Sequence, residues 1–177
     1  MNKNYMEIKF KALSVNESFA RIAVASFILA LNPTLEEIND VKTAVSEAVT
    51  NCVVHAYPKE KGDILLKCEI VENEVKIVIS DSGVGIIDIA KAREPFYTTK
   101  ANEERSGMGF AVMESFMDSV QVVNNNGGGI TVTMVKKIGQ QQKLIAEMWY
   151  AFSRRNITTD KSSTARRIFR KGYFVKK

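Results

Sequence analysis

The chain has 177 residues, of which 45% are hydrophobic and 25% are charged, a composition that suits one globular domain with its own core. No apolar run approaches the roughly 20 residues that a membrane span requires, and the first residues lack the hydrophobic region of a signal peptide. We therefore expect a cytoplasmic protein without membrane contact. The net charge of +5 is unevenly divided, because residues 1–138 carry 15 Lys/Arg and 18 Asp/Glu whereas residues 139–177 carry 10 and 2. An electrostatic argument for nucleic acid therefore applies only to the tail, and we expect no direct nucleic acid binding.

The chain opens with a strand and a helix. Residues 5–13 alternate between apolar and polar as a strand does. Ser14 and Glu17 have the spacing of a capping box, which predicts a helix over about 15–31. Asn32-Pro33 ends this helix. Its apolar side is expected to include Phe19, Ile22, Ala23, Phe27 and Ala30.

A second capping box, Thr34 with Glu37, predicts a longer helix that reaches about Ala56. Two strands follow at 63–71 and 74–80, and the polar turn between them predicts a hairpin. The cysteines, Cys52 and Cys68, lack metal-ligand spacing and are expected to be free thiols.

The remaining segments predict a loop, a helix and two strands. Residues 94–109 are polar and contain glycine, which favours a long functional or mobile loop. A helix is predicted at 109–118 and strands at 119–124 and 130–138. The order of elements predicts an α/β fold, a two-layer sandwich with a mixed sheet and helices on one face. The domain is expected to span 1–138, and 139–177 is expected to be a basic tail of unknown role, disordered or not native to the domain.

Three polar residues interrupt the second predicted helix at regular spacing. Glu47, Asn51 and His55 follow one another at intervals of four, so they lie on one helical face. A solvated outer face is the ordinary interpretation of such a stripe, and its surroundings argue against it, because the neighbouring residues are small or apolar and no Lys or Arg accompanies it. His55 is expected to stabilise the helix end rather than to act as a base or metal ligand.

Two glycine motifs lie downstream. Asp81-x-Gly83-x-Gly85 follows a predicted strand, where glycine permits close backbone approach to a ligand and the aspartate can accept a hydrogen bond from an amine. Ser106-Gly107-Met108-Gly109 opens a predicted helix, whose first backbone N–H groups favour phosphate. Neither the dinucleotide fingerprint nor the P-loop pattern occurs.

Taken in order, these residues resemble the GHKL ATPases, which share the Bergerat fold, and most closely the bacterial anti-sigma-factor serine/threonine kinase family. The segments that carry the resemblance are SEAVTNCVVHAY, DSGVGI, EPFYTTK, ERSGMGFAVMESFMD and GGGITV. The resemblance covers roughly residues 1–138, and the tail inherits no function from it.

The resemblance implies a role for each matching residue. Glu47 would be the general base that polarises the attacking hydroxyl, and Asn51 would hold Mg²⁺ and the triphosphate of ATP. Asp81 would bind the adenine amino group, and Gly83 and Gly85 would let the base approach the backbone.

The remaining implied roles concern the phosphates, the lid and the partner. The phosphates would be cradled below a lid at 94–108, Thr131 would lie behind Asp81 near the adenine, and Arg21 would contact a partner protein. The phosphate and lid residues are Thr98, Thr99, Lys100, Arg105, Ser106, Gly107, Met108 and Gly109.

The implied activity is transfer of the ATP γ-phosphoryl group to a serine of an anti-anti-sigma factor, together with binding and inhibition of a sporulation sigma factor of the sigma-F type. A homodimer through the first strand and helix is also implied. Three alternatives stay open: a GHKL ATPase that activates water, a histidine-kinase catalytic domain, and a nucleotide-sensing binding module without protein kinase activity. The ATPases use a second domain for which this chain is too short, and His55 is the only histidine.

Overall fold

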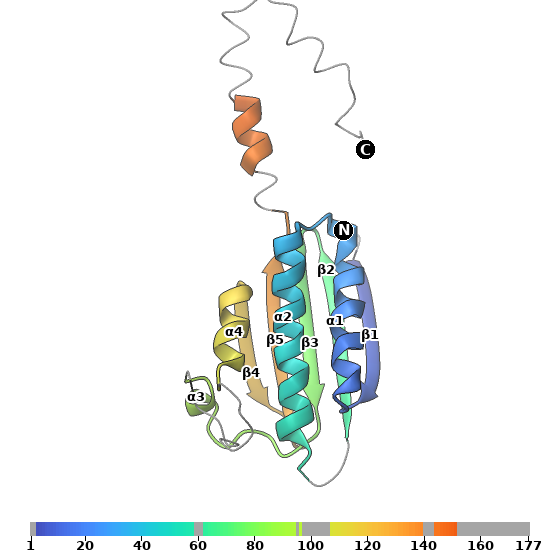
Figure 1. Cartoon of the computed structure of the whole chain (residues 1–177), viewed down its shortest axis with the longest axis vertical. Coiled ribbons are helices and arrows are strands. Elements are labelled where there is room, and N and C mark those ends of the chain that lie inside the picture. The colour runs from blue at the N-terminus through green and yellow to red at the C-terminus, as the bar shows by residue number, and fades with distance from the viewer. Residues whose placement is uncertain (1–2, 59–61, 95, 97–106, 140–143, 152–177) are drawn as a thin grey trace, which may run out of the picture. The chain divides into compact units, whose positions relative to one another are not determined.

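A five-stranded sheet with helices on one face forms the first part of the chain (Figure 1). The computed structural model describes residues 3–58, 62–94, 96, 107–139 and 144–151. The chain divides into two units, Met1–Gly139 and Gln140–Lys177. Among the described residues, no helix has the length and apolar character needed to cross a membrane.

The sheet runs in the order β1-β2-β3-β5-β4, and its four pairings are antiparallel. Its strands are β1 (Lys3–Lys11), β2 (Asp63–Val71), β3 (Glu74–Asp81), β4 (Ser119–Asn124) and β5 (Ile130–Lys137). The expected two-layer sandwich is confirmed, and the expected mixed sheet is wrong. The strands β3 and β4 run in the same direction but are not paired with each other. The strand β5 lies between them and is antiparallel to both, so the sheet contains no parallel pair.

The helices lie close to their expected positions. The first, α1 (Val15–Ile28), continues into a 3-10 turn η1 (Leu29–Leu31). The second, α2 (Leu35–Asn51), continues into a π-helical turn η2 (Cys52–Ala56). A short helix α3 (Ile89–Ala92) precedes α4 (Gly109–Phe116). Figure 1 shows α1, α2 and α4 in front of the sheet.

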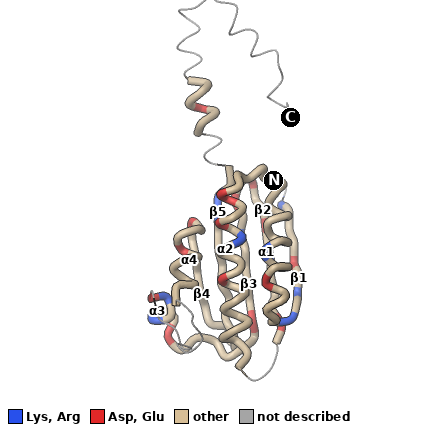
Figure 2. Tube along the Cα trace, viewed as in Figure 1, with Lys and Arg blue, Asp and Glu red and all other residues tan. Residues whose placement is uncertain are grey.

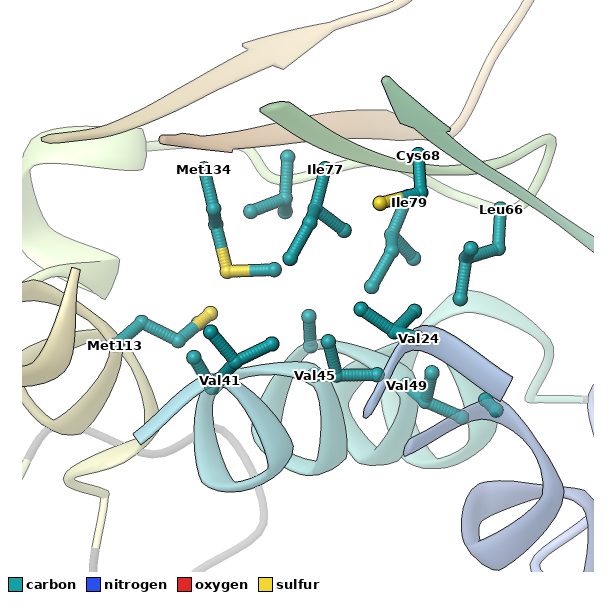
Figure 3. Packing of buried hydrophobic residues seen from close by; sticks show 14 of the residues in the cluster. Val24, Val41, Val45, Val49, Leu66, Cys68, Ile77, Ile79, Met113 and Met134 are labelled. Carbon is teal, nitrogen blue, oxygen red and sulfur yellow. The ribbon is translucent and has the colours of Figure 1, made fainter. Parts of the chain in front are cut away.

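The core lies between α2 and the sheet. The apolar face of α2 is buried at intervals of three and four residues, at Val41, Ala44, Val45, Ala48 and Val49. From the opposite layer the inward-facing side chains of β2, β3 and β5 meet this face (Figure 3). Side chains alternate in burial along β2, as expected where one sheet face is covered. Cys68 belongs to this core as a free thiol, and burial raises its pKa to about 12.

The helix α1 turns a different face to the sheet than its sequence predicts. Its buried residues are Ala20, Val24 and Ile28. Two members of the expected apolar side, Phe19 and Ile22, are instead 52% and 57% exposed. Because α1 carries apolar residues on two faces, periodicity by itself does not reveal which face the sheet covers.

The two capping boxes have different outcomes. Thr34 is extended, its hydroxyl accepts from the Glu37 N–H at 3.1 Å, and Glu37 Oε2 accepts from the Thr34 N–H at 2.8 Å. The expected box at Ser14 is wrong, because Ser14 has helical angles and makes no side-chain capping bond. Glu17 instead pairs with Arg21 at 3.3 Å.

Thr34, which caps α2, and Ser14, which makes no capping bond to α1, allow a matched test of how much a side-chain cap contributes to stability. We expect Thr34→Ala to lower the free energy of unfolding by about 1 kcal/mol, the usual cost of a lost cap. Ser14→Ala should change it by less than about 0.5 kcal/mol, as ordinary surface substitutions do. Urea denaturation followed by circular dichroism measures both, and equal losses for the two variants would contradict the assignment.

Candidate functional site

A cavity of about 890 Å³ opens where the end of α2, the loop after β3, and the start of α4 meet. Its volume lies within the roughly 300–1,000 Å³ range of small-molecule pockets. The helical side contributes Glu47, Thr50, Asn51, His55 and Ala56, and the loop after β3 contributes Asp81, Val84, Gly85, Ile86, Ile87 and Asp88. The α3 and α4 segments contribute Lys91, Ala92, Gly107, Met108, Gly109 and Phe110.

Glu47 and Asn51 converge on the first residue of α4. A methyl group added at Gly109 would lie 3.1 Å from Glu47 Oε2, 3.3 Å from Asn51 Nδ2 and 3.4 Å from Asn51 Oδ1. The polar stripe of α2 therefore faces a helix N-terminus, where backbone N–H groups attract anions. The absent side chain at Gly109 keeps a space open between the carboxylate, the amide and these N–H groups.

The glycine loop is tied to the end of α2. The Val84 N–H donates to the Ala56 carbonyl at 2.9 Å, across the π-helical turn η2. A Cβ at Gly83 would lie 2.1 Å from the same carbonyl oxygen, so no side chain fits at this position. The motif glycine thus lets two backbone segments touch at the cavity floor.

Asp81 is a buried polar residue at the bottom of the cavity, with 6% of its surface exposed. Its Oδ1 accepts from the Gly83 N–H at 2.9 Å, and its Oδ2 accepts from the Cys52 thiol at 3.4 Å. Burial, and then the Asp81 carboxylate, raise the pKa of the Cys52 thiol well above its usual range, so the thiol stays a donor. A carboxylate held in this way presents only acceptors and selects a ligand with an N–H donor.

The turn between β4 and β5 clamps the glycine loop from its other side. Asn124 Oδ1 accepts from the Ile86 N–H at 2.9 Å, and its Nδ2 donates to the Ile86 carbonyl at 2.8 Å. Asn125 Nδ2 donates to the Asp81 carbonyl at 3.0 Å and its Oδ1 accepts from the Thr131 hydroxyl at 2.8 Å. Thr131 therefore supports the loop from behind and does not line the cavity.

The cavity brings together most of the described residues that the sequence singles out. Gly83 packs against Ala56, which lines the cavity, without lining it itself. His55, at the helix end as expected, also lines the cavity. Arg21 lies apart on α1, where it pairs with Glu17 and Ser18. The lid residues Thr98, Thr99, Lys100, Arg105 and Ser106 fall outside the described residues. The predicted residues that line the cavity are Glu47, Asn51, Asp81, Gly85, Gly107, Met108 and Gly109.

Sequence reasoning missed the apolar wall and the cation of this cavity. Val84 and Ile87 are 69% and 108% exposed although both are aliphatic. Such residues favour an apolar or aromatic ligand that would cover them. The signal was present in the sequence, because aliphatic residues alternate with glycine in a loop that cannot bury them. Lys91 of α3 adds a positive charge to the lining.

The oxygen atoms that line the cavity suit a hard divalent cation that is also coordinated by a bound ligand. The Asn51 amide oxygen and the Glu47 carboxylate are oxygen donors of the kind that Mg²⁺ prefers. In the part of the chain that the structure describes, no three His, Cys, Asp or Glu side chains gather as a metal cluster. A cation here would therefore take most of its ligands from phosphates and water, as Mg²⁺ does in nucleotide sites.

Comparison with known proteins places this geometry in a family. A family model described as a histidine kinase-like ATPase domain matches residues 12–136. The chain is 54% identical over 138 residues to an anti-sigma F factor of Clostridium acetobutylicum, a match that covers 77% of this chain and 96% of the relative. It is 51% identical over 139 residues to an anti-sigma F factor of Caldanaerobacter subterraneus subsp. tengcongensis, covering 78% and 97%.

One solved structure supports the fold at lower identity. The crystal structure of the RsbU and RsbW domains of a Mycobacterium tuberculosis protein matches with a TM-score of 0.55 at 17% identity. The match covers 76% of this chain and 32% of that chain. At this identity the likeness concerns the arrangement of helices and strands alone.

The Asn124 clamp gives a test of the cavity that requires no ligand. We expect Asn124→Ala to speed hydrogen exchange of the Ile86 amide about five- to tenfold, because a net hydrogen bond contributes about 1 kcal/mol. Asn126→Ala, on the same exposed turn, should leave this rate unchanged. Exchange measured by NMR at Ile86 decides the matter, and equal rates in the wild type and the Asn124 variant would refute the clamp.

Proposed function

Because this chain belongs to the histidine kinase-like ATPase domain family, and within it to the anti-sigma F factors, we propose that it binds and inhibits a sporulation sigma factor and is a serine kinase for an anti-anti-sigma factor. The observation that carries this proposal is the convergence of Glu47 and Asn51 on Gly109. A base, an amide and a helix N-terminus around one open space form a site suited to phosphoryl transfer.

We place the adenine of ATP against the floor and the apolar wall of the cavity. The buried Asp81 carboxylate accepts from the exocyclic amine, and the aliphatic side chains of Val84 and Ile87 cover the ring. The triphosphate extends toward Asn51 and the N-terminus of α4, with Lys91 adding positive charge near its path.

The amide oxygen of Asn51 would coordinate Mg²⁺ together with phosphate oxygens of the nucleotide. When bound, the cation neutralises charge that develops on the transferring phosphoryl group.

In the proposed reaction Glu47 accepts the proton of the partner serine. The serine oxygen forms a bond to the γ-phosphorus, and the bond from that phosphorus to the β–γ bridging oxygen breaks. ADP leaves with the electron pair of that bond. Glu47 lies one helical turn from Asn51 on the same helical face, so the proposed base would lie beside the phosphate end of the nucleotide.

Partner binding is assigned to the helical layer around Arg21. Its guanidinium lies half-buried on α1, paired with Glu17. A partner carboxylate could replace Glu17 as the acceptor without leaving a buried charge. Phosphorylation adds about −1.5 to −2 charges to the partner serine, which would weaken its docking on a body where residues 1–138 carry more acidic than basic residues.

We further propose a homodimer through β1 and the outer face of α1. The strand β1 lies at a sheet edge, where unpaired backbone groups favour association. Beside it the outer face of α1 exposes Val15 at 75%, Phe19 at 52% and Ile22 at 57%, and Leu29 of the following turn η1 is 55% exposed. Phe19 also packs edge-on against Phe10 of β1 with ring centroids 6.0 Å apart. An apolar stripe beside a free edge is the surface a two-fold contact would cover.

The base assignment predicts a separation of binding from catalysis. We expect Glu47→Ala to lower the rate of phosphoryl transfer about 100- to 10,000-fold, the usual contribution of a general base, and to leave ATP affinity within about threefold, a change worth well under 1.4 kcal/mol. Radiolabelled ATP with the anti-anti-sigma partner measures transfer, and titration with a fluorescent nucleotide measures binding. Glu47→Gln, which keeps shape and loses basicity, should behave as Glu47→Ala does.

A wild-type rate in either Glu47 variant would refute this role. In the same assay, free phosphate without labelled serine would favour an ATPase. Label on the protein at histidine would favour a histidine kinase, and bound but uncleaved nucleotide would favour a binding module.

The dimer surface predicts a charge-sensitive association. Ile22→Glu should weaken dimerisation about 100-fold or more, because a two-fold interface contains the substitution twice. Leu35→Glu, at a residue 80% exposed on α2, should leave the association unchanged. Sedimentation equilibrium measures both, and a monomeric wild-type chain would remove this part of the proposal.

A further inference from the structure

A helix in the second unit exposes large apolar side chains. Residues 144–151 are helical and exposed. This helix lies beyond residues 12–136, the part that matches the ATPase family model, so the proposed kinase activity gives it no role. In Figure 2 it is almost free of charge, because Glu147 is its single charged residue.

The apolar side chains form one stripe. Leu144, Ile145, Met148 and Trp149 are 59%, 65%, 64% and 50% exposed. At 100° per residue they fall within an arc of about 140°. Trp149 combines an aromatic ring with a polar N–H group, the kind of side chain that concentrates at membrane–water interfaces. Tyr150 is the next residue in sequence and falls about 100° outside this arc.

Strong positive charge follows the stripe directly in sequence. Residues 152–177 contain nine Lys/Arg and a single acidic residue, Asp160. A short apolar helix binds a bilayer only marginally, and stable attachment needs a second signal such as a polybasic segment. The two signals are adjacent in this part of the chain.

We propose that the helix of residues 144–151 attaches this protein reversibly to an anionic phospholipid surface. The stripe of Leu144, Ile145, Met148 and Trp149 enters the boundary between headgroups and acyl chains. The cations of 152–177 provide attraction to the headgroups, which weakens with salt. This proposal revises the expectation, drawn from composition, that the protein makes no membrane contact.

Lipid fits these observations better than nucleic acid does. Positive charge alone suits either polyanion. Nucleic acid offers no apolar layer that would cover two aliphatic residues, a methionine and a tryptophan on one helical face. A bilayer offers both the anionic surface and the apolar layer beneath it.

The full-length protein tests the proposal through Trp149, its only tryptophan. We expect co-sedimentation with phosphatidylcholine vesicles that contain phosphatidylglycerol, and none with phosphatidylcholine alone. Binding should shift Trp149 emission to shorter wavelength and should decrease as salt is added.

A matched pair of variants distinguishes the contribution of the apolar stripe to vesicle binding from the effect of an added negative charge. Ile145→Glu should weaken vesicle binding about tenfold or more, since it replaces an exposed aliphatic group that would enter the bilayer. Ala146→Glu adds the same charge about 60° outside the arc of the stripe and should weaken binding much less. Thermal unfolding followed by circular dichroism checks that the first unit is intact in both variants.

Three outcomes would overturn the proposal. Failure of the wild type to bind anionic vesicles is the first. Equal losses in the two variants would be the second, because the apolar stripe would then have no part in binding. The third is a mobility shift of duplex DNA without vesicle binding, which would make nucleic acid the ligand.

Discussion

The helix α2 packs Val41, Val45 and Val49 onto the sheet without exposed surface, and this contact sets the position of everything at the site. Once that face is buried, Glu47 and Asn51 lie about 160° and 120° around the helix from its centre. In this orientation both side chains reach the first residue of α4, Gly109. The helix cannot rotate to move them without exposing its valines to water, at a cost of roughly 1.5–3 kcal/mol for each side chain. The positions of Glu47 and Asn51 are therefore secured by hydrophobic burial.

The glycine loop is secured in a different way, by polar contacts with two neighbours. On one side the Val84 N–H bonds to Ala56 at the end of η2, and on the other Asn124 holds both backbone groups of Ile86. Between these anchors the loop keeps Val84 and Ile87 exposed and Asp81 buried. Rigid anchors around an apolar, exposed lining are what a preorganised pocket requires, because binding then costs little ordering entropy. The polar stripe of α2 and the glycine loop thus depend on separate sets of interactions.

Much of the fold followed from local pattern. The strands at 63–71 and 119–124 were predicted with the bounds the structure has, because alternation with polar turns is a strong local signal. The Thr34 cap was correct and the Ser14 cap was wrong, since the same residue pair has two local conformations and the sequence does not distinguish them. The exposed face of α1 was misread because apolar residues serve both the core and a surface. At the site, residue types and order pointed to Glu47, Asn51 and Asp81, while Asn124 and Cys52 were missed because their partners are distant in sequence.

The amino-acid sequence by itself determined the elements, the polar stripe on the second helix, the two glycine motifs and the division between an acidic body and a basic tail. Each of these is a local property, set by periodicity, spacing or composition. Only the tertiary structure decided the antiparallel order of the sheet, the meeting of Glu47 and Asn51 with Gly109, and the clamp on the glycine loop. Those depend on which strand lies between which others and on backbones touching where a Cβ would not fit, and such long-range contacts leave no periodic trace in the chain.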